Sequence, residues 1–332
     1  MTQTRTDWNC SRFKPEDQSG FYESYFQRAN HPTRPLAFWI RYTSFSPKGQ
    51  PDKGCGELWA IYFDGETNLI TAVKETVPIS QCNFSRTQLD VRINGATLTD
   101  GALHGRAVSP SHIFQWSLRY TGHEPPLLLL PESLYERGFP KAKSLVGTPN
   151  AEYTGTLTVD GREIPIDGWR GSQNHNWGSR HTDHYAWGQV AGFDNAPDAF
   201  LECCTAQVKL GPVWSPRLTF VVLRDEGQET AINGLLQALR ASGNFDFFTW
   251  TIDARSPQAH IYGRIHAPAT VFVGLSYQNP PGGRKTCLNT KLASAEITVE
   301  RRGQPPRTLK TMHRAAFEIL TDRADHGVAI VV

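Results

Sequence analysis

The stretch from Gly168 to Gln189, GWRGSQNHNWGSRHTDHYAWGQ, concentrates the side chains best suited to chemistry. It holds three of the 11 histidines and three of the nine tryptophans of the chain. Aromatic faces beside titratable and amide groups suit a pocket for an apolar ligand, because apolar walls supply affinity and a few polar groups fix orientation. The structural alternative is a glycine-rich turn whose tryptophans fill a core and whose histidines are solvated.

Within this stretch His175 and Trp177 are two residues apart, so an extended backbone would point both side chains to one face. A proton donor would then lie beside an indole face. Tyr185 and Trp187 likewise share one face of the strand predicted to follow. That aromatic face either lines a cavity or fills a core.

A carboxyl group stands in the next predicted strand. Alternation along this strand places Glu202 on the same side as Phe200, in the more apolar row. Burial without a cationic partner would raise the pKa of Glu202 and keep it protonated near neutral pH, as a general acid requires. A structural ion pair with Arg180, Arg217 or Arg224 is the alternative.

Two charged residues stand among aromatic residues in the first part of the chain. Glu23 lies between Phe21 and Tyr25, and Arg41 follows Trp39 by two positions. Each would be poorly partnered alone, so the sequence predicts a cross-strand ion pair between Glu23 and Arg41.

From Phe21 onward the hydrophobic pattern has period two, which predicts an all-β fold. The dipeptides Asn94-Gly95 and Asp160-Gly161 indicate hairpin turns, because both tolerate positive φ. About eight strands on each side of the central stretch predict two consecutive antiparallel units, residues 1–178 and 179–332. A short helix is expected at Asn233–Ser242, with Gly243 as its stop.

Composition narrows the function classes. With 34 basic and 32 acidic residues the net charge is +2, which disfavours binding to nucleic acid. No secretory signal and no run of 18 apolar residues is present, so we expect a cytoplasmic protein without a membrane span. The six cysteines have no metal-ligand spacing, which favours free thiols and no metal site. Nucleotide-binding, zinc-protease and serine-hydrolase motifs are absent.

Three segments resemble the lipocalin-like (calycin) superfamily that includes carotenoid 1,2-hydratases, AttH-like proteins, plant tocopherol cyclases and certain fungal Diels–Alderases. They are the opening FYESYF at Phe21–Phe26, the hairpin YTGTLTVDGREIPIDGW at Tyr153–Trp169, and NHNWG at Asn174–Gly178. The last is similar to an Asp-His-Asn/Glu-Trp-Gly signature. The resemblance implies two successive lipocalin-like β-barrels with few short helices.

For chemistry, the resemblance implies acid-assisted hydration or ring closure on an isoprenoid or other apolar chain, without an organic cofactor or metal. The hydratase pairs would fall on His175 with Trp177 and on Phe200 with Glu202. This chain departs from the pattern, with Asn174 where Asp is usual, Phe200 for Tyr and Glu202 for Asp. The missing phenol removes a donor that the hydratases possess.

The sequence therefore leads to a hypothesis with two alternatives. The hypothesis is an enzyme of specialised lipid or isoprenoid metabolism that takes an apolar small molecule. The proposed catalytic groups are His175, Trp177 and Glu202, and the proposed substrate-binding groups are Phe200, Tyr185, Trp187, Asn174 and Asn176. A non-catalytic carrier of a hydrophobic molecule and a pericyclase that needs no proton transfer are the alternatives.

Overall fold

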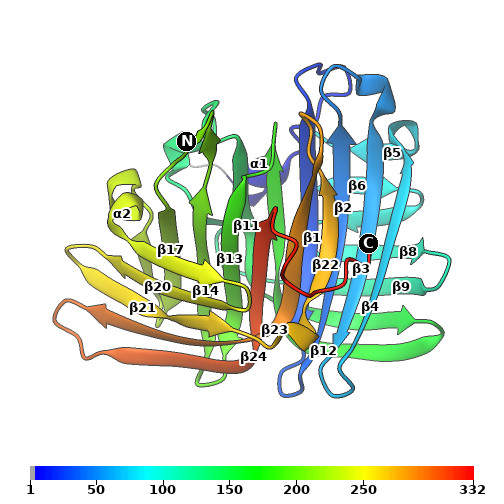
Figure 1. Ribbon diagram of the computed structural model, residues 1–332. Coiled ribbons are helices and arrows are strands. Elements are labelled where there is room, and N and C mark those ends of the chain that lie inside the picture. The colour runs from blue at the N-terminus through cyan, green and yellow to red at the C-terminus, as the bar shows by residue number, and fades with distance from the viewer. Residues whose placement is uncertain (1–3) are drawn as a thin grey trace.

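The computed structural model describes residues 4–332 as two large antiparallel sheets that lie side by side (Figure 1). The first sheet has 12 strands, all from the chain up to Gly178. These strands are β1 (Phe21–Asn30), β2 (Leu36–Ser46), β3 (Cys55–Asp64), β4 (Leu69–Pro78), β5 (Cys82–Phe84), β6 (Asp90–Ile93), β7 (Ala96–Thr99), β8 (Ala102–Val108), β9 (Ile113–Thr121), β10 (Leu127–Leu128), β11 (Ala142–Val159) and β12 (Arg162–Gly178).

The second sheet has 10 strands, all from His184 onward. They are β13 (His184–Phe193), β14 (Ala196–Gln207), β17 (Leu218–Asp225), β18 (Gln228–Ile232), β19 (Ser242–Asp246), β20 (Thr249–Arg255), β21 (Ala259–His266), β22 (Val273–Gln278), β23 (Arg284–Arg301) and β24 (Arg307–Thr321). A small ribbon is formed by β15 (Lys209–Leu210) and β16 (Val213–Trp214).

The first sheet curls until its two sides meet. Its order is β4-β3-β2-β1-β12-β11-β9-β8-β7-β6-β5, with β10 beside β11. Glu75 of β4 accepts a hydrogen bond from the backbone N–H of Val108 in β8 at 3.1 Å. The inward side chains form one buried core that includes Phe38, Leu58 and Trp169. The sheet is thus a nearly closed barrel.

The second sheet has the order β18-β17-β14-β13-β24-β23-β21-β20-β19, with β22 beside β23. A second core includes Leu201, Trp250 and Phe317 of this sheet and extends to Trp39 and Trp59 of the first sheet. Together the two sheets confirm the predicted all-β, lipocalin-like fold.

Two hairpin turns have the backbone conformation that the sequence predicts. Both residues of Asn94-Gly95 have positive φ (46° and 82°), as do both residues of Asp160-Gly161 (51° and 83°). This conformation matches the twist of a two-residue hairpin. The predicted hairpins β6–β7 and β11–β12 are therefore confirmed.

The Gly168–Gln189 stretch is not a turn, because most of it continues β12 and begins β13. Gly171 shows why glycine is needed within β12. A Cβ at this position would lie 1.8 Å from the backbone oxygen of Arg28 in β1. The close approach of the two strands therefore depends on the missing side chain.

Strands β1 and β12 pack their outer face against the second sheet. Arg28 of β1 donates through Nε to Gln189 Oε1 of β13 at 2.7 Å. Asn30 donates to the backbone oxygen of Lys291 in β23, also at 2.7 Å. The face between the sheets is thus both buried and polar, and it positions the candidate site.

Helices are few and short. They are α1 (Arg5–Asn9), α2 (Leu235–Arg240) and four single-turn 3-10 helices, η1 (Pro51–Lys53), η2 (Ile79–Gln81), η3 (Glu132–Leu134) and η4 (Ala269–Val271). The helix expected over Asn233–Ser242 is shorter than predicted, because Ala241 is extended and Gly243 already belongs to β19. No helix within residues 4–332 is long and apolar enough to cross a membrane.

Candidate active site

A cavity lies where the two sheets face each other. Its volume, counted together with its open mouth, is about 1330 Å³. The first sheet contributes side chains from β1, β2, β11 and β12, and the second from β13, β14, β17, β22 and β24. Aliphatic and aromatic residues make up most of the wall, among them Phe26, Trp39, Leu129, Leu130, Leu145, Tyr185, Trp187 and Phe220.

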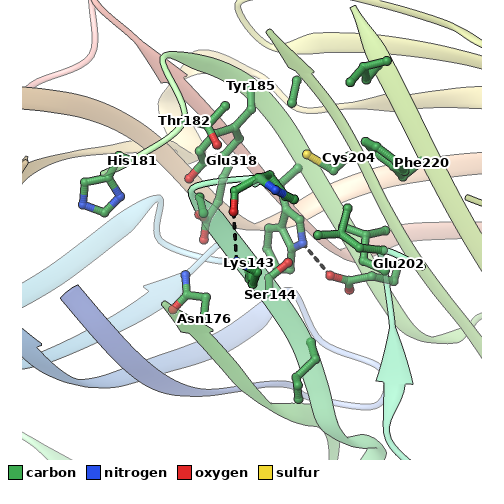
Figure 2. Close-up of a pocket in the computed structure, with 18 of the residues that line it drawn as sticks. Lys143, Ser144, Asn176, His181, Thr182, Tyr185, Glu202, Cys204, Phe220 and Glu318 are labelled. Carbon is green, nitrogen blue, oxygen red and sulfur yellow. Dashed lines mark hydrogen bonds between the residues drawn. The ribbon is translucent and has the colours of Figure 1, made fainter. Parts of the chain in front are cut away.

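Glu202 presents its carboxyl group at this cavity. Only 2% of the residue is exposed, and Oε1 accepts a hydrogen bond from Trp187 Nε1 at 2.7 Å (Figure 2). Oε2 accepts a second bond, from Gln189 Nε2 at 2.8 Å. Burial raises the pKa of Glu202 to about 7, although both hydrogen bonds favour the ionised form. A substantial fraction of the carboxyl groups is therefore protonated at neutral pH.

A chain of polar side chains fixes the partners of Glu202. Gln189 Oε1 accepts from Arg28 Nε at 2.7 Å and from the hydroxyl of Ser172 at 2.6 Å. Because arginine has only donors, the amide oxygen of Gln189 must face Arg28 and its nitrogen must face Glu202. The same nitrogen donates to Asn174 Oδ1 at 2.7 Å.

The register of the second sheet explains this placement. Gln189 of β13 is opposite Glu202 of β14, and Trp187 is opposite Cys204. Alternation then turns Glu202 and Cys204 to the cavity and Cys203 to the core behind them. The predicted face of this strand is the observed one.

The structure does not bring His175 and Trp177 to the cavity. Alternation along β12 turns them into the first barrel, while their neighbours Asn174 and Asn176 line the cavity. His175 is fully buried, with Nε2 2.9 Å from Glu23 Oε1 and Nδ1 3.0 Å from the backbone oxygen of Trp8. The expected convergence of His175, Trp177 and Glu202 on one cavity is therefore not met.

Trp177 and Phe200 also have packing roles. The guanidinium of Arg12 lies 3.8 Å from the centre of the Trp177 ring, in a small core that also contains Trp8. Phe200 is fully buried against Val146 and Val222 and does not line the cavity. Of the expected substrate-binding residues, Tyr185, Trp187, Asn174 and Asn176 do line it.

The predicted ion pair between Glu23 and Arg41 is wrong. Strand β2 places Ser44 opposite Glu23 and Arg41 opposite Phe26, so the two charges lie on opposite faces of the sheet. Glu23 instead accepts hydrogen bonds from His175, the Ser11 hydroxyl and backbone N–H groups. Although burial opposes ionisation, these bonds lower the pKa of Glu23.

One acidic residue of the cavity wall, Glu318, was not singled out from the sequence. Glu318 of β24 lies opposite Trp187, and its Oε1 is 2.8 Å from the buried Lys291 Nζ. Asn289 donates to the same oxygen, also at 2.8 Å. The sequence could have identified Glu318, because an acid in the apolar run AAFEIL resembles the pattern that identified Glu202.

Solved structures of known proteins share this arrangement of strands. An AttH-like protein of Nitrosomonas europaea aligns over 91% of both chains with a TM-score of 0.57 and 14% identity. Kievitone hydratase of Nectria haematococca aligns over 97% of this chain and 96% of its own, with a TM-score of 0.57 and 11% identity. CghA aligns over 98% of this chain and 96% of its own, with a TM-score of 0.58 and 12% identity. The chain has the lipocalin-like fold of the hydratase and AttH group.

Comparison of sequences gives less information about this chain than comparison of structures does. No family model matches the chain. Two Mycobacterium tuberculosis proteins named as uncharacterized, MT0513 and Rv0493c, are each 28% identical over 222 residues. The match covers 67% of this chain and 64% of each relative, so it spans less than two thirds of their length.

Proposed function

We propose that this chain is an enzyme that hydrates or cyclises an apolar small molecule, with Glu202 as the proton donor. The observation that carries the proposal is a buried carboxyl group in an apolar cavity with a pKa raised to about 7. A general acid works best when its pKa lies near the operating pH, because it is then partly protonated and still acidic enough to transfer the proton. The solved hydratase of the same fold is consistent with this chemistry.

In the proposed reaction Glu202 first donates a proton and later takes one back. Glu202 transfers its proton to an alkene carbon and becomes a carboxylate, leaving a cationic centre on the substrate. Water or an internal π bond then attacks that centre, and the carboxylate recovers the proton that the adduct releases. The acid is regenerated, and the step needs no group beyond substrate, water and this side chain.

Aromatic faces favour the cationic stage. Phe26 and Trp187 meet edge to face with ring centres 5.9 Å apart, and both line the cavity. Aromatic rings attract a nearby cation through their quadrupole, by about 0.5–2 kcal/mol each. The Trp187 N–H also holds Glu202 in position, so one side chain serves both the acid and the developing charge.

The test begins by identifying the ligand. Mass spectrometry of small molecules retained by the purified protein supplies candidates, which are then incubated with wild type and with Glu202→Gln in D₂O. We expect the wild type to form a product that carries solvent deuterium on carbon, and E202Q to lose at least 100-fold in rate, as removal of a general acid does. Glu152→Gln, which alters an exposed carboxyl group of β11, is the matched control and should retain the wild-type rate.

Each competing function gives another outcome. A carrier binds the candidate and releases it unchanged in both proteins. A pericyclase forms a ring without taking up solvent deuterium, and E202Q then keeps most of the rate. Either result would rule out the proton-donor role of Glu202.

A further inference from the structure

One part of the cavity wall carries a buried cation that forms no ion pair among residues 4–332. Arg41 of β2 lines the cavity and is only 4% exposed. Its Nε has no hydrogen-bond partner among residues 4–332, and its guanidinium carbon lies 4.5 Å from the centre of the Tyr277 ring. A buried charge normally has an opposite charge and satisfied hydrogen bonds, because removing it from water is costly.

The acids nearest in the fold are already engaged. Glu57, on the neighbouring strand β3, forms an ion pair with Lys74 at 2.7 Å. Glu318, on the other side of the cavity, forms one with Lys291 at 2.8 Å. Each carboxylate forms its ion pair with a lysine, so neither is an ion-pair partner of Arg41, although both attract its charge and help to raise its pKa.

Neutral donors and aromatic rings surround Arg41. Trp39, two residues earlier on the same face, also lines the cavity, and its Nε1 has no partner in the described chain. Tyr22 stacks on His181 with ring centres 4.0 Å apart. Burial lowers the pKa of His181 to about 3, so its ring is neutral and adds no second charge.

Most of the remaining wall is apolar, and it extends to Glu202. Arg41, Phe26 and Asn174 occupy one row across β2, β1 and β12. Two strand spacings separate Arg41 from Asn174, about 10 Å. Asn174 is joined to Glu202 through Gln189. His181 and Glu202 lie on opposite sides of the cavity in Figure 2.

We propose that Arg41 binds an anionic oxygen group of the ligand, such as a carboxylate, while the apolar body of the ligand extends along the cavity to Glu202. The substrate class is then an organic acid with an apolar chain or ring system. This inference rests on the proposed function, because it names the substrate class of the same cavity. An anion beside Arg41 supplies a direct ion pair and an acceptor for its unpaired Nε, and the Trp39 N–H supplies a second donor.

The experiment measures binding and needs no turnover. N-phenyl-1-naphthylamine, a neutral fluorescent probe, fills the cavity, and decanoate or decan-1-ol displaces it at pH 7.5. The two competitors differ only in the charged head group. We expect decanoate to displace the probe from wild type at a concentration at least 10-fold lower than decan-1-ol does. Equal concentrations in wild type would overturn the proposal without any variant.

Variants then locate the preference. Arg41→Met should remove it by weakening decanoate alone, and Arg41→Lys, which keeps the charge, should retain part of it. Lys143→Met is the matched control, because Lys143 also lines the cavity but already donates to two backbone oxygens. A preference that survives in R41M with an intact probe signal, or disappears in K143M, would contradict the assignment.

Failure of this proposal is distinguishable from failure of the proposed function. Glu202→Gln should keep the preference for decanoate, since the amide lies at the other end of the ligand. Loss of turnover in E202Q without any preference in wild type overturns only the Arg41 site. Preference for decanoate with full turnover in E202Q overturns only the proton donor.

Discussion

Replacing Glu202 with glutamine should remove a pH-dependent part of the free energy of unfolding. The ordinary pKa of a glutamate is 4.5, and burial raises that of Glu202 to about 7. Between these values the folded chain binds more protons than the unfolded chain, so its stability falls as the pH rises. The contribution is fully present below pH 4.5 and is lost as the pH passes 7.

The size of the effect follows from the shift in the pKa of Glu202. One pKa unit corresponds to about 1.4 kcal/mol, and the change that Glu202 contributes between pH 5 and pH 8 is about 2.5 kcal/mol. An amide at position 202 does not ionise, so E202Q lacks this component. Its NH₂ group would face the N–H of either Trp187 or Gln189, but that cost is the same at both pH values and cancels in the difference.

The assay is urea unfolding of wild type and E202Q at pH 5 and pH 8. We expect wild type to lose about 2.5 kcal/mol more than E202Q between the two conditions. Cys204→Ala is the control, because it alters the same face of β14 and keeps the carboxyl group. If wild type and E202Q lose the same free energy within about 0.5 kcal/mol, Glu202 does not have a raised pKa and the reasoning fails.

Three further substitutions test other contacts. Trp187→Phe removes an N–H that favours ionised Glu202, so the alkaline limb of the pH–rate profile should move to higher pH. His175→Ala leaves the buried carboxyl of Glu23 without its imidazole and should cost about 3–5 kcal/mol in urea unfolding, with probe binding by the folded protein unchanged. Gly171→Ala should lower stability by more than about 2 kcal/mol, measured by thermal unfolding, because its Cβ would collide with the backbone of β1.

Turns and strand faces were accessible from the sequence where the local pattern is distinctive. The turns Asn94-Gly95 and Asp160-Gly161 were predicted, and they join β6 to β7 and β11 to β12. The rows that hold Glu202 and Trp187 also follow from period two, because an acid and an indole stand in otherwise apolar series. The fold class and these cavity residues therefore depend on a local pattern.

The local pattern does not show which face of β12 meets the cavity. Both of its faces are buried near Gly178, one against the first barrel and one against the second sheet. Alternation separates His175 from Asn174 but does not say which of them meets the cavity. Packing between the sheets decides this, and it is a long-range property.

Arg41 illustrates a second limit. Its position among aromatics was visible in the sequence, but its partner depends on the register of β1 and β2. The pairing of Phe26 with Arg41 places Glu23 on the other face. A shift of one residue would reverse this outcome, so composition alone cannot fix it.

Because the cavity walls come from two sheets, its width depends on how those sheets dock. Substitutions at the docking face, such as at Asn30 or Arg28, can therefore widen or narrow the space. Ligand size can thus diversify among proteins of this architecture through the residues that lie between the two sheets. A chain cut between Gly178 and His184 would need its two fragments to reassociate before the cavity re-formed.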